Sequence, residues 1–351
     1  YHPFNYYGAE DATDVIVAMG SVNQAIEETV DYLVGQGKKV GVLEVHLYRP
    51  FSEKYFFAAM PATVKRIAVI DRTIEQGALG EPLYLDVKAV YYGKENAPLI
   101  IGGRYGLASK DTTPDMINSI YQNLAGEAKN PFTVGINDDI NHTSLEVTEH
   151  IDVADPTTTE LLFFGLGSDG TVGACKNTSK IIGDNTDLYS QSYAAYDSKK
   201  SGGSTRLHLR FGKNPIRSTY LVNNPHFVSC STDAYLAKFN MIDGLRQGGT
   251  FLLNTVCPVE EIETLLPNRY NRILAERNAK FYIINANKLA VEIGLKGKTN
   301  TIMQSAFFKL NQHILPYEKA KELMKAYAAK TFAKKGQAII ERNYNAIDGG
   351  G

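Results

Sequence analysis

Short apolar runs alternate with amphipathic stretches along the first third of the chain. Asp14–Met19 is rich in β-branched and apolar side chains, which is typical of a strand buried on both faces of a parallel sheet. Apolar side chains and one threonine then recur at positions 22, 25, 26, 29, 30 and 33, on one face of a predicted helix that Gly35 and Gly37 end. Further strands are predicted at 40–47, 66–70 and 99–101, and a helix at 114–121. Strands that alternate with helices predict a doubly wound parallel sheet.

A second series of strands and helices begins at Glu160, after a polar, turn-rich stretch at 126–159 that we expect to be a linker. Strands are predicted at 161–164, 188–196, 204–211, 227–229, 250–254 and 281–284, and helices at 171–182, 301–310 and 317–330. In the run 204–211, Leu207, Leu209 and Phe211 lie on one side and Arg206, His208 and Arg210 on the other. We therefore predict an α/β protein with two doubly wound, mainly parallel sheets, in domains at 1–125 and 160–345, with a tail at 346–351.

The composition is that of an ordinary globular protein of 351 residues, with 44% hydrophobic and 21% charged side chains. A net charge of −1 gives no general electrostatic reason to expect nucleic acid or a membrane as a partner, and no apolar run approaches a membrane span of roughly 20 residues. The three cysteines are widely spaced, which favours reduced thiols over a disulfide scaffold, a zinc site or an iron–sulfur cluster. The chain begins at Tyr1, without a methionine and in the middle of a pattern, so we expect a piece of a longer polypeptide; no signal peptide is visible.

A glycine-rich turn is the first candidate for chemistry. The strand that ends at Phe164 runs into Gly165-Leu166-Gly167-Ser168-Asp169-Gly170, and Thr171 opens a helix. Glycines at this spacing let backbone N–H groups approach a phosphate, and the helix adds the positive end of its dipole. A tight strand–helix turn selects the same glycines without any ligand, so the pattern by itself leaves both interpretations open.

A basic cluster follows the next strand. The stretch from Tyr196 to Lys213 holds five basic residues against one aspartate, a net charge of +4 in a nearly neutral chain. Asp197 stands where a dinucleotide site offers an acidic group to a ribose hydroxyl, but Lys199 and Lys200 follow it and suit a phosphate on that ribose. Ser201 and Gly202 add small hydrogen-bonding groups. This favours a phosphorylated adenosine, as in NADP or coenzyme A, over a solvated basic loop.

Other candidates are less specific. Lys176 and Asn177 lie in the second turn of the helix that follows the glycine turn. Two interpretations stay open for them: contact with a bound ligand, or an ordinary position on the helix surface. We expect Cys175 to be a small buried hydrophobe rather than a reactive thiol. Scattered histidines indicate no metal site, and Gly183-Asp184-Asn185 lacks the second glycine and the spacing of a magnesium–thiamine diphosphate motif. Core or interface roles are expected for Glu44, His46, Arg49 and Asp71, so we predict no catalytic and no metal-binding residue.

Several long strings resemble the pyruvate:ferredoxin (flavodoxin) oxidoreductases. Residues 15–21, 46–52 and 71–73 resemble that family's second domain, which is similar to the transketolase C-terminal domain, and residues 134–139 resemble its connecting segment. The strings at 163–171, 196–203, 208–212, 248–254 and 299–310 resemble its third, Rossmann-like domain. The likeness covers nearly the whole chain. It departs from the family at Cys175, where a small polar residue such as asparagine is expected.

The resemblance implies an oxidoreductase that decarboxylates pyruvate to acetyl-coenzyme A and passes electrons to ferredoxin or flavodoxin. Thiamine diphosphate, Mg²⁺ and iron–sulfur clusters would belong to other domains of a homodimeric parent with no nucleic-acid or membrane partner. That parent would lie in the cytoplasm or, as an alternative, in an organelle of an anaerobic eukaryote. The third domain would bind coenzyme A, and this piece would be inactive alone. Carried over by motif, the residues that face coenzyme A are Gly165, Gly167, Ser168, Asp169, Gly170, Thr171, Lys176, Asn177, Lys199, Lys200, Ser201, Gly202 and, as a weaker candidate, Asn254.

Two other functions remain open at this stage. A self-contained NADP-linked reductase would use the same glycine turn and lysine pair, but the chain offers no evident acid for a hydride site, such as a well-placed Tyr-x-x-x-Lys. A non-catalytic scaffold with an empty glycine turn would also fit the pattern. Separate titrations with coenzyme A and NADPH distinguish these possibilities.

Overall fold

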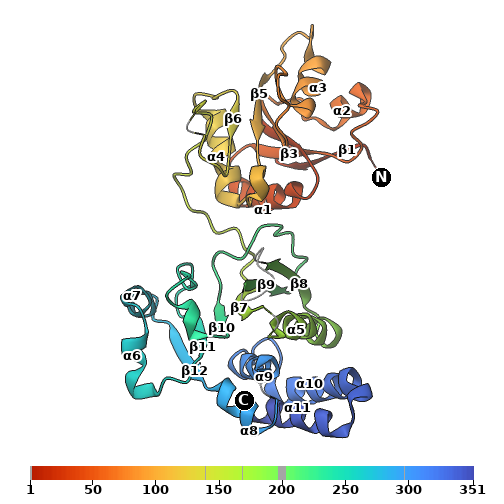
Figure 1. Cartoon of the computed structure of the whole chain (residues 1–351). Coiled ribbons are helices and arrows are strands. Elements are labelled where there is room, and N and C mark those ends of the chain that lie inside the picture. Colours follow the sequence, from red (N-terminus) through yellow and green to blue (C-terminus); the bar gives the residue numbers. More distant parts are fainter. Residues whose placement is uncertain (1, 139, 168, 197–202, 296) are drawn as a thin grey trace. The chain divides into compact units, whose positions relative to one another are not determined.

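The structure is a computed structural model that describes residues 2–138, 140–167, 169–196, 203–295 and 297–351. It contains two compact units (Figure 1). Unit 1 consists of Tyr1–Ala154 together with Arg217–Leu221, and unit 2 consists of Asp155–Ile216 and Val222–Gly351. Serine 168 and the segment 197–202, which carries the predicted lysine pair, lie outside the described residues.

Unit 1 is built on a six-stranded sheet in the order β1-β3-β2-β4-β5-β6. Its strands are β1 (Phe4–Gly8), β2 (Asp14–Met19), β3 (Val40–Val45), β4 (Arg66–Asp71), β5 (Leu99–Arg104) and β6 (Phe132–Thr133). Its helices are α1 (Val22–Gly35), α2 (Glu53–Ala59), α3 (Pro82–Tyr91) and α4 (Pro114–Ala125), with a 3₁₀ turn η1 (Leu107–Ser109). All neighbouring strands are parallel except β1, which pairs antiparallel with β3.

Alternate side chains of β2 explain why helices cover both faces of this sheet. Ile16 and Ala18 pack in one cluster with α1 and α4, whereas Val15 and Val17 pack in another with α2 and α3. This burial on both faces explains why the sequence of β2 is a continuous apolar run. Helices cover both faces of the sheet, so the predicted doubly wound sheet is confirmed.

The expected linker at 126–159 is largely part of unit 1. Its residues Phe132, Val134 and Ile151 are buried, and Phe132 and Val134 belong to the core cluster of α1 and α4. Unit 1 also includes the short segment 217–221, which is held on α1 by carboxylates. The Arg217 guanidinium donates to Glu27 at 2.9 Å, and Ser218 Oγ and Tyr220 Oη each donate to Glu28 at 2.9 Å.

Unit 2 has a six-stranded sheet in the order β12-β11-β10-β7-β9-β8. Its strands are β7 (Thr159–Leu166), β8 (Tyr189–Tyr196), β9 (Ser204–Gly212), β10 (Phe227–Cys230), β11 (Thr250–Asn254) and β12 (Lys280–Ile284). Strands β7, β10, β11 and β12 are parallel, but β9 runs antiparallel to both β7 and β8. The sheet is therefore mainly parallel, as predicted. The antiparallel insertion follows from chain length, because the short connection between β8 and β9 permits a hairpin but not a parallel crossover.

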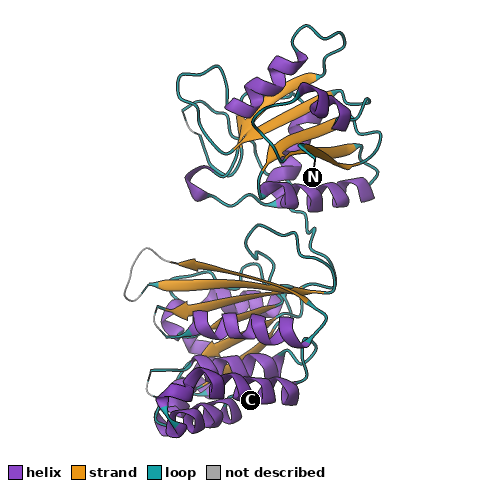
Figure 2. Ribbon diagram, turned by 90° about the vertical axis from the view of Figure 1, so that its right-hand side faces the viewer, coloured by secondary structure: helices purple, strands orange, loops and turns teal. Residues whose placement is uncertain are grey.

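The helices of unit 2 are α5 (Thr171–Asn185), α6 (Ile262–Leu265), α7 (Asn268–Glu276), α8 (Ala286–Glu292), α9 (Asn300–Leu310), α10 (Tyr317–Phe332) and α11 (Gln337–Gly349). The 3₁₀ turns are η2 (Asp233–Tyr235), η3 (Val259–Glu261) and η4 (Ala333–Lys335). Helices α5, α8, α9, α10 and α11 contribute to one core cluster, and α6 and α7 pack on the other face of the sheet (Figure 1). Figure 2 shows helices packed along the strands of each unit. The expected tail at 346–351 is mostly the end of α11, where Ala346 and Ile347 are buried.

Strand β9 keeps the predicted alternation but is buried on both sides. Leu207, Leu209 and Phe211 pack in the cluster of α5, as expected for the apolar side. On the other side, Arg210 donates to Glu160 at 2.8 Å, and both side chains are only 3% exposed. His208 Nδ1 accepts from the Val222 amide at 3.1 Å, and burial, helped by Arg210 and Arg206, lowers the pKa of His208 to about 4. The histidine is therefore neutral at physiological pH.

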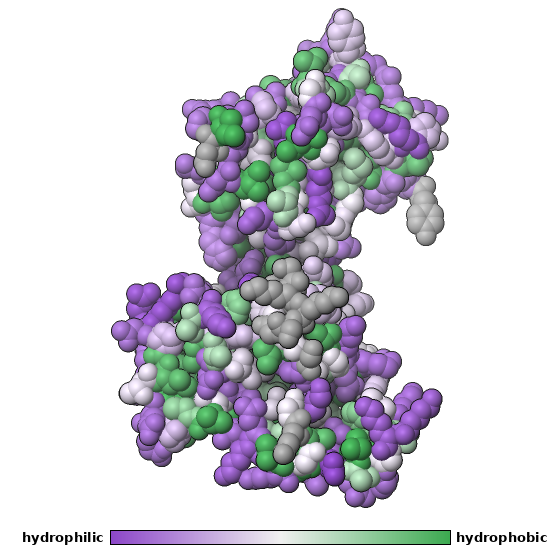
Figure 3. All heavy atoms as spheres, viewed as in Figure 1, coloured by the Kyte–Doolittle hydropathy of each residue, from purple (hydrophilic) through white to green (hydrophobic). Residues whose placement is uncertain are grey.

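Apolar and polar side chains are intermixed over the visible face of each unit (Figure 3). Among the described helices, each is too short or too polar to cross a lipid bilayer.

Candidate functional site

The glycine turn joins β7 to α5, as the sequence predicts. A Cβ built on Gly165 would lie 2.6 Å from the Thr171 Cβ, so the first glycine lets the start of α5 pack closely against the strand. Gly170 adopts a left-handed conformation with φ of 93°, and a Cβ there would lie 2.9 Å from the Asn300 Cγ. Glycine at both positions is therefore required by backbone conformation and packing.

The glycine turn is hydrogen-bonded to Gly203, the residue that follows the segment with the lysine pair. The Gly167 amide donates to the Gly203 carbonyl at 2.9 Å. Leu166 pairs with Ser204, and Tyr196 at the end of β8 pairs with Thr205. Both ends of the connection that contains Lys199, Lys200, Ser201 and Gly202 therefore lie at the same edge of the sheet as the glycine turn, although these four residues lie outside the described part of the chain.

The Asp169 carboxylate points back into the turn. It accepts hydrogen bonds from the Thr171 amide at 2.7 Å, the Leu166 amide at 2.9 Å and the Ser231 hydroxyl at 3.1 Å. The bond from Thr171 satisfies the first backbone amide of α5, and the bond from Ser231 joins the turn to the end of β10. Asp169 thus shapes the loop, and its contact with a ligand stays a prediction.

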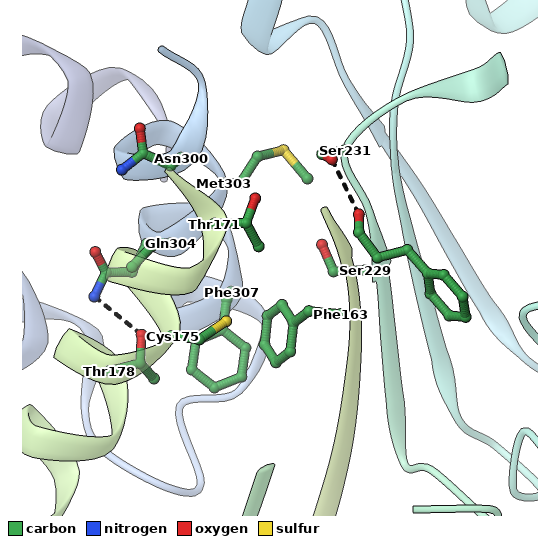
Figure 4. Close-up of a pocket in the computed structure, with 12 residues that line it drawn as sticks. Phe163, Thr171, Cys175, Thr178, Ser229, Ser231, Asn300, Met303, Gln304 and Phe307 are labelled. Atoms are coloured by element: carbon green, nitrogen blue, oxygen red, sulfur yellow. Dashed lines mark hydrogen bonds between the residues drawn. The ribbon is translucent and has the colours of Figure 1, made fainter. Parts of the chain in front are cut away.

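A small cavity of about 20 Å³ lies beside the turn, between α5, α9 and the ends of β7 and β10 (Figure 4). This volume suffices for about one water molecule. Figure 4 shows side chains from α5 and α9 on one side of the cavity and Phe163, Ser229 and Ser231 on the other. Its polar lining is uncharged and consists of Thr171, Thr178, Ser229, Ser231, Asn300 and Gln304. Such a site offers amide and hydroxyl groups to a ligand rather than charge.

The thiols near this edge are not poised for nucleophilic chemistry. Cys175 lines the cavity and is 3% exposed, as expected for a small buried hydrophobe. Burial, with the charge of Asp169 in addition, raises the pKa of the Cys175 thiol well above its ordinary value. Burial also raises the pKa of Cys230 to about 12. Since the thiolate is the reactive form, both groups are inert at neutral pH.

The remaining predicted residues lie in different settings. Lys176 is exposed on α5, and Asn177 beside it is partly buried. Asn254 is 1% exposed, and its side chain donates to the Ser231 carbonyl and accepts from the Ala286 amide, each at 2.9 Å. Asn254 thus links the end of β10 to the start of α8, and its contact with a ligand stays a prediction.

Sequence reasoning did not select Ser231, Asn300 or Gln304 as site residues. They come from β10 and α9, and only the packing of those elements against α5 brings them to the glycine turn. From the sequence, Arg206 was considered only as one of the basic residues between Tyr196 and Lys213. The Arg206 guanidinium is exposed and lies over the rings of Phe164, at 5.9 Å, and Phe239, at 5.3 Å.

In unit 1, the acidic residues near strand ends have buried roles. Asp71 is 3% exposed and accepts from the Leu83 and Tyr84 amides at 3.2 Å, while burial raises its pKa. Glu44 is 8% exposed, and its desolvation beside Glu27 raises its pKa to about 7. Within the described ranges, no three His, Cys, Asp or Glu side chains are grouped so that they would hold a metal ion.

Comparison with known proteins identifies the family. Residues 160–351 match the family model for pyruvate ferredoxin/flavodoxin oxidoreductase, and residues 12–117 match the model for pyruvate:ferredoxin oxidoreductase core domain II. The chain is 54% identical to the pyruvate-flavodoxin oxidoreductase of Enterobacter agglomerans over 100% of its own length, and 51% identical to the pyruvate:ferredoxin oxidoreductase of Moorella thermoacetica over 99%. It spans 30% of the length of each of these relatives.

Among solved structures, the pyruvate oxidoreductase subunit PORC of Thermotoga maritima is similar to part of the chain. The match has 22% sequence identity and a TM-score of 0.45, and covers 55% of this chain and 95% of that subunit. The two family models together cover most of both units. The sequence resemblance is therefore confirmed, and the chain belongs to the pyruvate ferredoxin/flavodoxin oxidoreductase family.

Proposed function

We propose that this chain is the part of a pyruvate:ferredoxin or pyruvate:flavodoxin oxidoreductase that binds and positions coenzyme A. The relatives are named for pyruvate and for flavodoxin or ferredoxin, and this chain corresponds to 30% of their length. The complete polypeptide would convert pyruvate to acetyl-coenzyme A, with thiamine diphosphate, Mg²⁺ and iron–sulfur clusters held by its other domains.

One observation carries the proposal. The hydrogen bond from the Gly167 amide to the Gly203 carbonyl joins the glycine turn to the end of the lysine segment. A strand–helix turn suits a nucleotide phosphate, and the lysine pair in the connection whose ends lie at the same sheet edge suits a phosphate on the ribose of an adenosine. Coenzyme A has a 3′-phosphate on its ribose, so it would use both the glycine turn and the lysine pair.

The contribution of this chain would be positional. Its cysteines near the turn are buried and protonated, and the polar groups of the cavity are hydroxyls and amides. Holding the coenzyme A thiol near a reacting centre supplied by other domains converts a bimolecular step into an effectively unimolecular one.

Calorimetric titration of the chain with coenzyme A, dephospho-coenzyme A and NADPH at one salt concentration tests the proposal. We expect coenzyme A to bind most tightly, and the double variant Lys199→Glu, Lys200→Glu to weaken it by about tenfold or more, since each charge reversal repels the 3′-phosphate. The matched control is Lys334→Glu with Lys335→Glu, an adjacent lysine pair at exposed positions of η4. A preference for NADPH would favour a reductase, and no binding of either nucleotide would favour a scaffold.

A further inference from the structure

The edge strand β1 of unit 1 directs part of its backbone away from the sheet. The Pro3 carbonyl accepts a hydrogen bond at 2.9 Å and the Ala9 amide donates one at 3.0 Å, both on the side of β3. In the described part of the chain, β3 is the one strand that pairs with β1. Bonding in an antiparallel pair alternates from residue to residue, so the N–H and C=O groups of Phe4, Tyr6 and Gly8 point outward.

A groove of about 640 Å³ borders this free edge. Its lining includes Tyr6 and Gly8 of β1, Val30 and Val34 of α1, and Met60 at the end of α2. Val30 and Met60 belong to core clusters on opposite faces of the sheet, and Figure 1 shows α1 and α2 on either side of β1. The groove therefore passes around the edge, where an additional strand would lie between the two helices.

The two walls of the groove are apolar. Val34 is 36% exposed in the last turn of α1, and Ala58 and Ala59 add small side chains at the end of α2. Because successive side chains of a strand point to opposite faces, a strand beside β1 would contact α1 and α2 alternately. In this mode of recognition the main-chain bonds supply affinity, and the contacts of alternate side chains supply specificity.

The charged side chains of the groove are acidic. Glu10 and Asp31 line it, and its described lining includes no lysine or arginine. Asp31 accepts from Tyr7 Oη at 2.6 Å and pairs with Arg217. Glu10 is exposed and has no ion pair within the described ranges. The last turn of α1, at the negative end of the helix dipole, also lacks a basic residue. A lysine or arginine would be stabilised here, whereas a second copy of β1 would bring another Glu10 and be repelled.

We propose that the groove beside β1 receives an extended strand from another part of the parent polypeptide, with apolar side chains toward α1 and α2 and a lysine or arginine beside Glu10. The chain spans 30% of the length of its relatives, so the remainder of such a polypeptide is available to supply the strand. The added strand would also close an edge that is otherwise open to non-specific pairing. This surface belongs to unit 1 and the proposed coenzyme A site to unit 2, so either proposal can fail alone.

Hydrogen exchange with residue-level mass spectrometry, in the complete polypeptide and in the 351-residue chain, tests the source of the strand. We expect the outward amides of Tyr6 and Gly8 to exchange about tenfold more slowly, or slower still, in the complete polypeptide. The amides of Asn5 and Tyr7 already face β3 and should slow by a smaller factor. Unchanged exchange of Tyr6 and Gly8, or equal slowing of all four amides, would overturn the proposal.

Charge reversal tests the chemistry of the strand. Glu10→Lys in the complete polypeptide should lose most of this protection, and the control Glu75→Lys, at an exposed position outside the groove, should keep it. On the 351-residue chain, acetyl-Val-Lys-Val-Thr-Val-amide should slow the Tyr6 and Gly8 amides several-fold more than the same peptide with glutamate in place of lysine. Equal effects of the two peptides, or equal protection in the two variants, would refute the basic residue and with it the proposal.

Discussion

The carboxyl pair formed by Glu44 of β3 and Glu27 of α1 should make unit 1 less stable as the pH rises toward neutrality. Glu44 is 8% exposed, and desolvation, together with a hydrogen bond and charge repulsion from Glu27, raises its pKa from 4.5 to about 7. Two further side chains contact the pair: His46 Nε2 lies 3.3 Å from the Glu44 carboxylate, and Arg217 donates to Glu27 at 2.9 Å. Replacing Glu44 with glutamine keeps a hydrogen-bond donor toward Glu27 and removes the ionisable carboxyl group.

The sign follows from proton binding by the folded and unfolded states. Between pH 4.5 and about 7 the folded chain retains a proton on the pair that the unfolded chain has released, so the free energy of unfolding falls as the pH rises. Below 4.5 both states are protonated and above about 7 both are ionised, so the curve is flat outside this window. The difference between these two pKa values corresponds to at most about 3 kcal/mol of unfolding free energy. The apparent pKa belongs to the two carboxyl groups together and not to Glu44 alone.

Hydrogen exchange of the β3 amides measures this effect, because it reports on unit 1 alone in a chain with two cores. After correction for intrinsic exchange, Glu44→Gln should lose most of the decrease in stability between pH 4.5 and 7, and should be more stable than the unaltered chain above pH 7. Ionisable groups that do not contact Glu44 contribute equally in both proteins and cancel in the difference. In the control Glu27→Gln, burial of Glu44 remains, so part of the decrease should persist. If the stability of unit 1 changed with pH in the same way in Glu44→Gln and in the unaltered chain, the reasoning would be refuted.

Three further substitutions test the packing of unit 2. Gly165→Ala should destabilise it by about 1–3 kcal/mol in urea unfolding, because the new Cβ overlaps the start of α5, whereas Gly173→Ala, with open space around it in the same helix, should stabilise it by about 0.5–1 kcal/mol. Arg210→Met should cost about 1–3 kcal/mol, since the buried Glu160 then loses this ion pair and keeps the one with Arg246 at 3.0 Å, and adding Glu160→Leu should recover part of that loss. Ile347→Ala should cost about 2–4 kcal/mol if 346–351 is core; no change in the unfolding midpoint would restore the idea of a tail.

Strands buried on both faces were the most predictable elements. The bounds of β2 and β11 in the structure are those expected from their apolar runs, because a parallel strand covered by helices has no polar face. Strand β1 was not predicted. It is an antiparallel edge strand whose middle residues are only partly buried, so its sequence Phe-Asn-Tyr-Tyr-Gly carries neither a clean alternation nor an apolar run.

The direction of β9 shows a different limit. Alternation along 204–211 states which side chains share a face, and that part was confirmed. Alternation carries no information about strand direction, because reversing the strand preserves its two faces. The short connection after β8 did contain that information, since a parallel crossover needs a dozen or more residues. Loop length, more than side-chain pattern, would have predicted the antiparallel insertion.

The glycine turn separates what a motif predicts about structure from what it predicts about chemistry. Gly165 is required by contact with Thr171, and Gly170 by its left-handed backbone and by contact with Asn300, so packing alone accounts for these two glycines. The same string would therefore occur in a turn without a ligand. Gly167 is informative for another reason, since its bond to Gly203 joins two segments that are separate in sequence and complementary in chemistry. A nucleotide site would therefore be indicated by that junction and by the charge distribution around it, and not by the spacing of the glycines.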